Sequence, residues 1–476
     1  MSEAILPVQA RAQTSHQEKE WSPAKVIYMI LMALALLSHI WLMVIGAGID
    51  NIPTYIWIIR LLTVPFAFCL GKLWKDKGFQ ILCLYFLLFF FRCFIPNPGS
   101  VFSVEVAESI LGALWLFAGC YGMARALTVN QFKRFLSICS IVWIAGISIL
   151  AGIGIYTAWT DQIIKLSNEA IIQASEGRLK LVYEATTSGA ILSMTLLVGI
   201  VYACCTKQRI CRAFVFLVLL PIILAIALTD SRTAYISVAT GISAMIIITI
   251  IRHFVNKAAI PEEIHKRILF IACIIIALLV LIVAFVIAFM HITPVFNYLK
   301  IRGLIPKALA EGTEKTIIES RGFDGSRVLS GRDNLWRWIY EYIVRNPIML
   351  LKGKTKIFPL GYIAGWYGHC HNILLQVLVE SGIPGLMLIL MFAWRTVIRS
   401  MFVITKPGVS LKVCLLPAIL LSLFVADMGE CFIWLRASYI PVSATMFIFA
   451  GTICTQSPRG NKSTSLQHSF KGAVLP

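Results

Sequence analysis

Long apolar stretches, separated by short polar segments, recur along almost the whole chain. They lie near residues 26–46, 55–71, 79–96, 104–124, 135–157, 187–206, 211–229, 232–251, 268–291, 372–394, 413–427 and 431–453. Most approach the roughly twenty residues that an α-helix needs to cross a membrane. They are too continuous for the alternating pattern of a membrane β-barrel, and helices satisfy their own backbone groups in lipid. The pattern therefore predicts an all-α polytopic membrane protein with about 12 transmembrane helices.

Composition supports this prediction and argues against two other classes. Hydrophobic residues make up 59% of the chain and charged residues 14%, with a mean hydropathy of +0.83, which excludes a water-soluble fold. The net charge of +19 would suit a nucleic-acid partner. However, the basic residues mostly occupy short segments between apolar stretches, as in cytoplasmic loops, so no nucleic-acid partner is expected. Most of the 13 cysteines lie inside apolar stretches and indicate neither a disulfide nor a zinc framework.

The basic connections also predict an orientation. Lysines and arginines gather in alternate connections, for example Lys72–Lys77 and Arg252–Arg267, which should be cytoplasmic together with both termini. The remaining connections are short except for residues 158–186 and 292–371, which should face outward. No cleavage site follows the first apolar stretch, so we expect that helix to be retained. The predicted order is a cytoplasmic tail (1–25), transmembrane helices 1–9 (26–291), a catalytic outer loop (292–371), transmembrane helices 10–12 (372–453) and a second cytoplasmic tail (454–476).

The outer loop 292–371 is basic, with twelve lysines and arginines against six acidic residues. A long loop can cross the membrane whatever its charge, so a solvated basic surface is one explanation, and an anionic substrate is the other. Residues 330–345 repeat apolar side chains at helical spacing, with charges on the opposite face, and Asn346-Pro347 ends the pattern. The apolar set is Leu335, Trp338, Ile339, Tyr342 and Ile343, and the charged set is Arg337, Glu341 and Arg345. This pattern predicts an amphipathic helix on the membrane surface.

Two arginine motifs could bind an anion. In Thr229-Asp230-Ser231-Arg232-Thr233, a tight turn accounts for the serine and aspartate. The turn does not account for the presence of an arginine together with that aspartate between apolar helices, where ionisable residues are costly. In Ser330-Gly331-Arg332, Ser330 could simply cap the surface helix, but Arg332 would lie in its first turn, where free N–H groups favour anions. Because the guanidinium fork matches phosphate oxygens, Arg232 and Arg332 could clamp one diphosphate.

A third motif, Gly368-His369-Cys370-His371-Asn372, precedes the tenth predicted span. The two histidines and the cysteine suggest a metal site, but their spacing fits no usual zinc motif and no carboxylate stands beside them. A histidine at the membrane boundary can instead act as a general base or orient a hydroxyl, or it can be structural. Arg60 and Arg92 also fall toward the outer ends of their spans. They are secondary candidates for substrate binding, because snorkelling explains them equally well.

In this order, the motifs resemble the conserved block of the bacterial O-antigen ligase and O-antigen polymerase superfamily of lipid-linked glycan transferases. The block comprises Ser330-Gly331-Arg332 with Trp336, Asn346-Pro347, Gly353, His371-Asn372 with Leu375, and Glu380-Ser381-Gly382-Ile383-Pro384-Gly385. Asp230-Ser231-Arg232-Thr233 resembles the upstream arginine motif of the family. The resemblance covers roughly residues 228–395, whereas the earlier spans match only in hydropathy and number.

The resemblance implies a membrane glycosyltransferase at the outer face of the bacterial inner membrane. It would move a glycan from an undecaprenyl-diphosphate carrier to a lipid- or glycan-linked acceptor, without a metal or other cofactor. Arg232 and Arg332 would hold the diphosphate and His371 would act on the acceptor hydroxyl, with Ser231, Ser330 and Asn372 as further substrate-binding residues. The motifs do not distinguish a ligase from a polymerase.

Two other classes remain open. A transporter or flippase for an anionic lipid could use the same arginines as a binding site, although transporters usually carry polar groups at the bilayer midplane. Here the charges gather at one face. A scaffold subunit without catalysis is the third alternative, and only the family resemblance argues against it.

Overall fold

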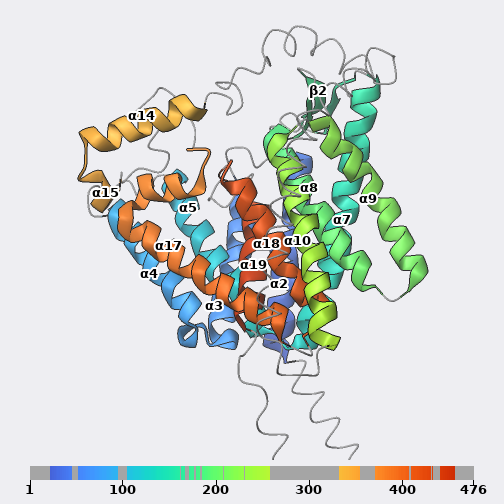
Figure 1. Cartoon of the computed structure of the whole chain (residues 1–476), viewed down its shortest axis with the longest axis horizontal. Coiled ribbons are helices and arrows are strands. Elements are labelled where there is room, and N and C mark those ends of the chain that lie inside the picture. The colour runs from blue at the N-terminus through green and yellow to red at the C-terminus, as the bar shows by residue number, and fades with distance from the viewer. Residues whose placement is uncertain are drawn as a thin grey trace, which may run out of the picture.

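The computed structural model is a bundle of helices that stand side by side, with one short helix lying across an end (Figure 1). It describes residues 22–45, 52–94, 104–160, 162–166, 171–175, 178–182, 185–206, 208–229, 231–257, 332–353, 370–406, 409–429, 431 and 440–455. The helices in order are α2 (Pro23–Ile45), α3 (Thr54–Gly71), η1 (Leu73–Lys75), α4 (Lys77–Phe94), α5 (Val104–Leu114), the π-helical turn η3 (Trp115–Cys120), α6 (Tyr121–Ala126), α7 (Val129–Thr160), α8 (Ala185–Cys205), α9 (Arg209–Thr229), α10 (Arg232–Lys257), α14 (Arg332–Arg345), α15 (Met349–Lys352), α17 (Ile373–Thr405), α18 (Leu411–Asp427) and α19 (Ile440–Thr455).

These helices coincide closely with the apolar stretches of the sequence. Seven helices in the described part of the chain are long and apolar enough to cross a membrane, and three shorter apolar ones accompany them. The polytopic helical class is therefore confirmed. The predicted span 268–291 lies outside the described residues, as do both tails and most of the loop 292–371. The number of spans and the predicted domain boundaries consequently stay predictions.

A small β-sheet corrects the prediction that the fold is all-α. It is antiparallel, with the strand order β1 (Ile164–Lys165), β2 (Ile171–Ser175) and β3 (Arg178–Leu181). Ile172 pairs with both Ile164 and Leu181, and its side chain is buried together with that of Leu179. The strands are short and lie inside one connection between two long apolar stretches. Their alternation is therefore weak beside the helical signal around them.

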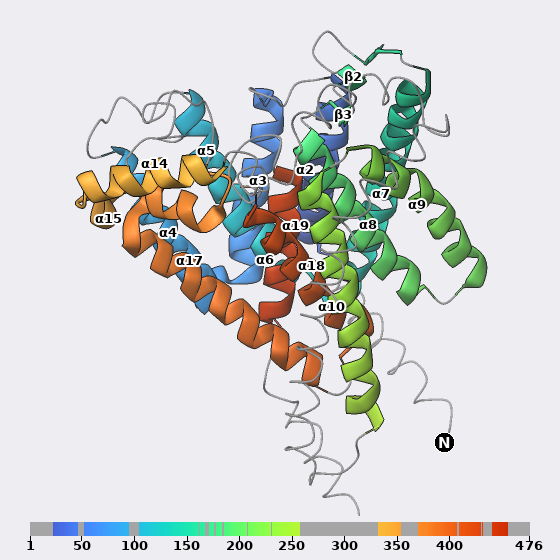
Figure 2. The ribbon, with the colours of Figure 1, turned by 45° about the horizontal axis from the view of Figure 1, so that its top comes forward.

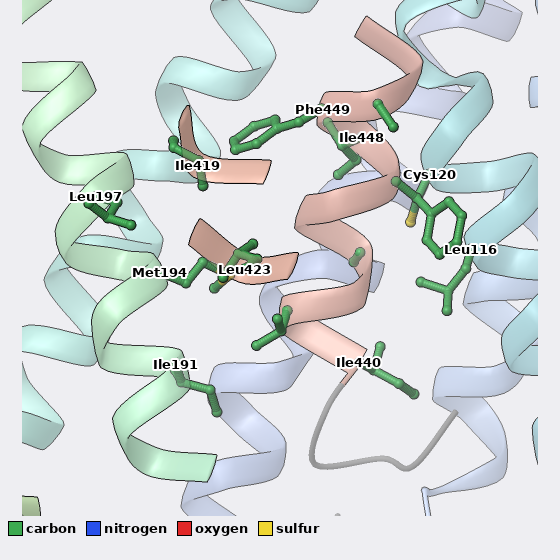
Figure 3. Close-up of a cluster of buried hydrophobic side chains, with 14 of the residues drawn as sticks. Leu116, Cys120, Ile191, Met194, Leu197, Ile419, Leu423, Ile440, Ile448 and Phe449 are labelled. Carbon is green, nitrogen blue, oxygen red and sulfur yellow. The ribbon is translucent and has the colours of Figure 1, made fainter. Parts of the chain in front are cut away.

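The centre of the bundle is formed by α18 and α19, which lie between α8 and the π-helical turn η3 (Figure 3). Met194 of α8 and Leu423 of α18 are almost completely buried there, as are Ile448 of α19 and Leu116 of η3. By contrast, α9 exposes large apolar side chains along its length, including Ile210, Phe214, Leu217 and Leu220. An apolar outer face of this kind is typical of a helix in contact with lipid.

Polar contacts hold together the connections that were predicted to be cytoplasmic. The Arg252 guanidinium donates to the backbone carbonyls of Ile404 at 3.3 Å, Lys406 at 2.6 Å and Val409 at 2.8 Å. The Asp76 carboxylate accepts from Arg125 at 2.6 Å and lies 3.9 Å from Arg395. The β-sheet and α14 lie at the opposite end of the bundle (Figure 2). The two ends thus separate the connections as the alternating charges predicted, while the side that each faces stays a prediction.

Candidate functional site

The first arginine motif lies where α9 ends and α10 begins. The Ser231 side chain is fully buried, and its Oγ accepts a hydrogen bond from the Ala234 N–H at 3.3 Å, which caps α10. A β-carbon on Gly189 of α8 would lie only 2.8 Å from the Ser231 Cβ, so the two helices approach closely here. Arg232 is the first residue of α10 and its side chain is exposed. Asp230 lies outside the described residues.

A further arginine, which no sequence motif indicates, lies at the same turn. The Arg178 Nε, on strand β3, donates to the Thr229 carbonyl at 3.1 Å. This contact brings a second guanidinium to the turn that carries Arg232. The available signal was the charge of Arg178 in a connection predicted to face outward. However, a separation of 51 residues from Thr229 gave no reason to pair them.

The second arginine motif begins α14, as predicted. Arg332 is the first residue of the helix, but its side chain, and the whole of Ser330, lie outside the described residues. The predicted apolar face needs one correction, because Trp338 is 45% exposed and Trp336 instead packs against the protein with Leu335 and Ile339. Trp336 stands three residues before Ile339, and Trp338 stands three residues after Leu335. Helical spacing therefore admits either tryptophan, and packing on α17 selects Trp336.

The third motif forms a turn that is held by three helices. The Cys370 N–H donates to the Gln376 Oε1 at 2.8 Å, and the Cys370 carbonyl accepts from the Trp336 Nε1 at 2.9 Å. His371 is half-buried and has a left-handed backbone, with φ at 49°. Asn372 caps α17, since its Oδ1 accepts from the Leu375 N–H at 3.1 Å, and its Nδ2 donates to the Met428 carbonyl at 3.3 Å. His371 therefore projects from a turn fixed by α14, α17 and the end of α18.

These contacts give two of the predicted substrate-binding residues a structural role. The amide of Asn372 uses its oxygen and its nitrogen to cap α17 and to join α18, and the Ser231 hydroxyl caps α10. Capping alone would select both residue types. Direct contact of Ser231, Ser330 or Asn372 with a substrate stays a prediction.

The contacts of α18 relate the first motif to the third. Near the start of α10, the Ser237 Oγ lies 2.8 Å from the Ser422 Oγ of α18, and the Ser422 hydroxyl donates to the Ser237 carbonyl at 2.7 Å. The end of α18 then receives Asn372 at Met428. The start of α10 and the His371 turn therefore adjoin the same end of α18.

The surroundings of Arg60 correct the snorkelling interpretation of this residue. Its side chain is completely buried. Its Nη2 lies 2.9 Å from the His39 Nε2, and its guanidinium carbon is 4.9 Å from the ring centroids of both Trp57 and Trp115. A snorkelling arginine would instead extend to water. Arg60 is therefore enclosed by α2, α3 and η3 in this conformation, while the side chain of Arg92 lies outside the described residues.

A break in α17 lets α15, the short helix that follows α14, pack closely against it. Gly382 interrupts the helix with φ at 64° and ψ at −174°, and Gly353, which ends α15, has φ at 65°. A β-carbon on Gly353 would overlap the Glu380 carbonyl oxygen, and one on Gly382 would lie 2.7 Å from the Leu351 carbonyl oxygen. Backbone thus meets backbone, which explains why the motif block carries glycine at these two positions.

An apolar cavity adjoins the His371 turn. It has a volume of about 470 Å³ and lies between α4, η3, α10, α17, α18 and α19. Its lining includes Phe86, Phe117 and Ile248. Ile373 and Leu374, which directly follow Asn372, also line it. Such a cavity suits a hydrocarbon chain whose polar end lies at the turn.

Cys370 bears on the metal hypothesis for this turn. Burial raises the pKa of its thiol well above the ordinary value, and the nearby Glu380 raises it further. Zinc binds the thiolate form, so this environment disfavours Cys370 as a ligand. No group of three metal-ligating side chains occurs among the described residues, but His369 lies outside them. Sensitivity of the activity to a chelator therefore tests the metal hypothesis.

The fold and the turn define a polytopic helical membrane protein whose chemistry-bearing motifs gather at one end of the bundle. Comparison with known families agrees: residues 217–390 match the family model described as O-antigen ligase. The matched stretch contains both arginine motifs, α14, the His371 turn and the break in α17. The match confirms the resemblance to the O-antigen ligase superfamily that the ordered motifs predicted, and it supports a membrane protein that transfers glycans. No curated protein matches the chain.

Proposed function

We propose that this protein is a glycosyltransferase that moves a glycan from undecaprenyl diphosphate to an acceptor hydroxyl. The observation that carries the proposal is the family match over residues 217–390. Three helices in that stretch begin at its motifs, because α10 starts at Arg232, α14 at Arg332 and α17 directly after Asn372. Helix N-termini carry partial positive charge and free N–H groups. Together with the arginines, they form the kind of environment that a diphosphate requires.

The proposed chemistry is a direct displacement at the anomeric carbon of the donor sugar. The acceptor oxygen bonds to that carbon while the carbon–oxygen bond to the diphosphate breaks, and the electron pair stays on the diphosphate oxygen. Arg232 and Arg332 stabilise the growing negative charge, and His371 accepts or orients the hydroxyl proton. Inversion at the anomeric carbon follows. The apolar cavity beside the turn would hold part of the polyprenyl chain, with the reaction at the outer face of the inner membrane.

Deleting the gene in its host tests this function. We expect loss of the mature surface polysaccharide and accumulation of glycan on its lipid carrier. A ligase would leave long unattached chains, whereas a polymerase would leave single repeat units, so the length of the accumulated glycan distinguishes the two. Unchanged surface glycan and an unchanged carrier pool would refute the proposal. Retention of the carrier-linked substrate at the cytoplasmic face, with no transfer by purified protein, would instead indicate a transporter or flippase.

The two motif arginines should be needed for donor binding. We expect Arg232→Ala and Arg332→Ala each to raise the KM for the lipid-diphosphate donor by about 10- to 100-fold, the range for losing a hydrogen bond to a charged group. Lysine at either position should rescue only partly, because it keeps the charge but not the bidentate fork. The assay uses purified protein, with membrane insertion checked separately.

Arg337→Ala is the matched control for the arginine variants. Arg337 lies on α14 and is well exposed, with only a 3.8 Å surface contact to Glu341, which contributes little. We expect the KM of the Arg337→Ala protein for the lipid-diphosphate donor to stay near that of the wild type. Full activity in both lysine variants would instead reduce Arg232 and Arg332 to generic basic surface.

A further inference from the structure

A chain of buried polar contacts leads from the His371 turn into α17. Gln376 is completely buried and Glu380 nearly so, and both belong to the helix that follows the turn. The Gln376 Oε1 accepts from the Cys370 N–H at 2.8 Å, and its Nε2 donates to the Glu380 Oε1. Burying an amide and a carboxylate is costly unless they are hydrogen-bonded, so residues that serve only packing would be apolar here.

Glu380 determines which way the Gln376 amide points. A carboxylate accepts hydrogen bonds, so the Gln376 nitrogen must face Glu380 and its oxygen must face the Cys370 N–H. That orientation is the one in which Gln376 can hold the turn. Glu380 therefore acts on the turn through Gln376.

The backbone carbonyl of Cys370 is bound by a residue of α14. This carbonyl accepts from the Trp336 Nε1 at 2.9 Å, and it belongs to the peptide bond between Cys370 and His371. The residue before His371 is thus held at its N–H by α17 and at its carbonyl by α14. Asn372 is held on the other side by its cap and by Met428.

His371 needs such support because its backbone is left-handed, with φ at 49°. A residue with a side chain pays for this conformation, and it persists only where its surroundings determine it. If the contacts of Cys370 were lost, the turn could relax and the imidazole would change direction. The same contacts join the turn to α14, the helix that begins at Arg332.

We infer that Gln376 and Trp336 are positioning residues which fix the Cys370–His371 peptide and hold His371 in register with Arg332. The inference rests on the proposed function, since it assigns these residues to the placement of the proposed base. Neither residue needs to touch substrate. Glu380 has a supporting role, because it orients Gln376.

Two conservative variants test the inference in the full-length protein. Trp336→Phe keeps the ring but removes the N–H donor, and Gln376→Leu keeps the approximate volume but removes both hydrogen bonds. We expect kcat to fall by about 10- to 100-fold in each, the scale for misplacing a reacting group. The KM for the lipid-diphosphate donor should change little. The double variant should lose less than the product of the single losses, because both act on one residue.

Two control variants isolate positioning from stability. Trp338→Phe makes the same change at an exposed position of α14 and should leave kcat unchanged. Tyr28→Phe removes a buried hydrogen bond, 2.9 Å long, from the Tyr28 hydroxyl of α2 to the Gly119 carbonyl of η3. Neither helix contributes to the His371 turn. Tyr28→Phe should lower the melting temperature about as much as Trp336→Phe without lowering kcat. A fall in kcat that follows the melting temperature across all four variants would overturn the inference.

A measurement that needs no activity separates this inference from the proposed function. Hydrogen exchange at the amides of residues 370–372 should accelerate by up to about tenfold in Gln376→Leu and Trp336→Phe, and not in Trp338→Phe. Unchanged exchange would show that these side chains do not hold the turn. Faster exchange with normal kcat would show that holding it does not matter for transfer. Wild-type protein that transfers no glycan would refute the proposed function, while the exchange data would still test the contacts.

Discussion

His371→Ala is expected to abolish glycan transfer while the protein still inserts into the membrane. The imidazole projects from a turn that three helices fix, so the substitution removes the side chain and leaves its support in place. A positioned general base contributes about 10²- to 10⁴-fold to a rate, and a loss of this size should leave no detectable product. The assay is transfer by purified protein from lipid-diphosphate glycan to an acceptor.

His369→Ala is the comparison for this prediction, and we expect a milder effect because only His371 lies within the His-Asn-x-x-Leu motif. A required zinc bound by His369, Cys370 and His371 would behave differently. Substitution of each residue would then be similarly severe, and a chelator would inactivate the wild type. Normal turnover by His371→Ala would remove this histidine from the chemistry.

Gly382→Ala is expected to have the largest effect on stability among the substitutions considered. Its backbone, with φ at 64° and ψ at −174°, is open to glycine but strained for any other residue. The added β-carbon would also lie 2.7 Å from the Leu351 carbonyl oxygen and 2.9 Å from that of Leu350. We expect a loss of about 2–4 kcal/mol, a lower melting temperature and impaired transfer, because α15 would no longer seat on α17.

Gly152→Ala provides the control for the glycine variant. Gly152 lies within α7, and nothing approaches within 4 Å of its missing β-carbon. Alanine should therefore be neutral or should stabilise the protein by up to about 1 kcal/mol. Thermal unfolding of both variants in the same detergent measures the difference. Equal melting temperatures for Gly382→Ala and the wild type would show that the close contact with α15 is not required.

The parts of the fold that sequence could predict are those with a regular pattern along the chain. Apolar stretches located the helices, and the three- and four-residue spacing after Ser330 located α14, including its end at Arg345. The same spacing could not decide between Trp336 and Trp338, because packing on α17 makes that choice. The sheet between α7 and α8 escaped prediction because its strands are too short to compete with the surrounding helical signal.

The contacts that build the site join residues far apart in the sequence. Gly353 meets the Glu380 backbone, and Arg178 reaches the end of α9. No local pattern indicates either pair. Arg60 was misjudged for a similar reason, since its position near the end of a span suggested water, whereas His39 and two tryptophans enclose it. The motif resemblance identified many of the residues in these contacts, but only their arrangement gives the physical reason for them.

The contacts of Gln376 also constrain how related sequences can vary in length. Successive residues of an α-helix are rotated by about 100°, so inserting or deleting one residue between Gln376 and Glu380 would turn their side chains away from each other. The Cys370 N–H is only six residues from Gln376, to which it donates, so a change of length between these two residues would break that hydrogen bond as well. Any homologue that uses this arrangement must therefore keep the spacing from His371 to Glu380. An alignment of relatives without gaps between these two positions would be the evolutionary trace of the same contacts.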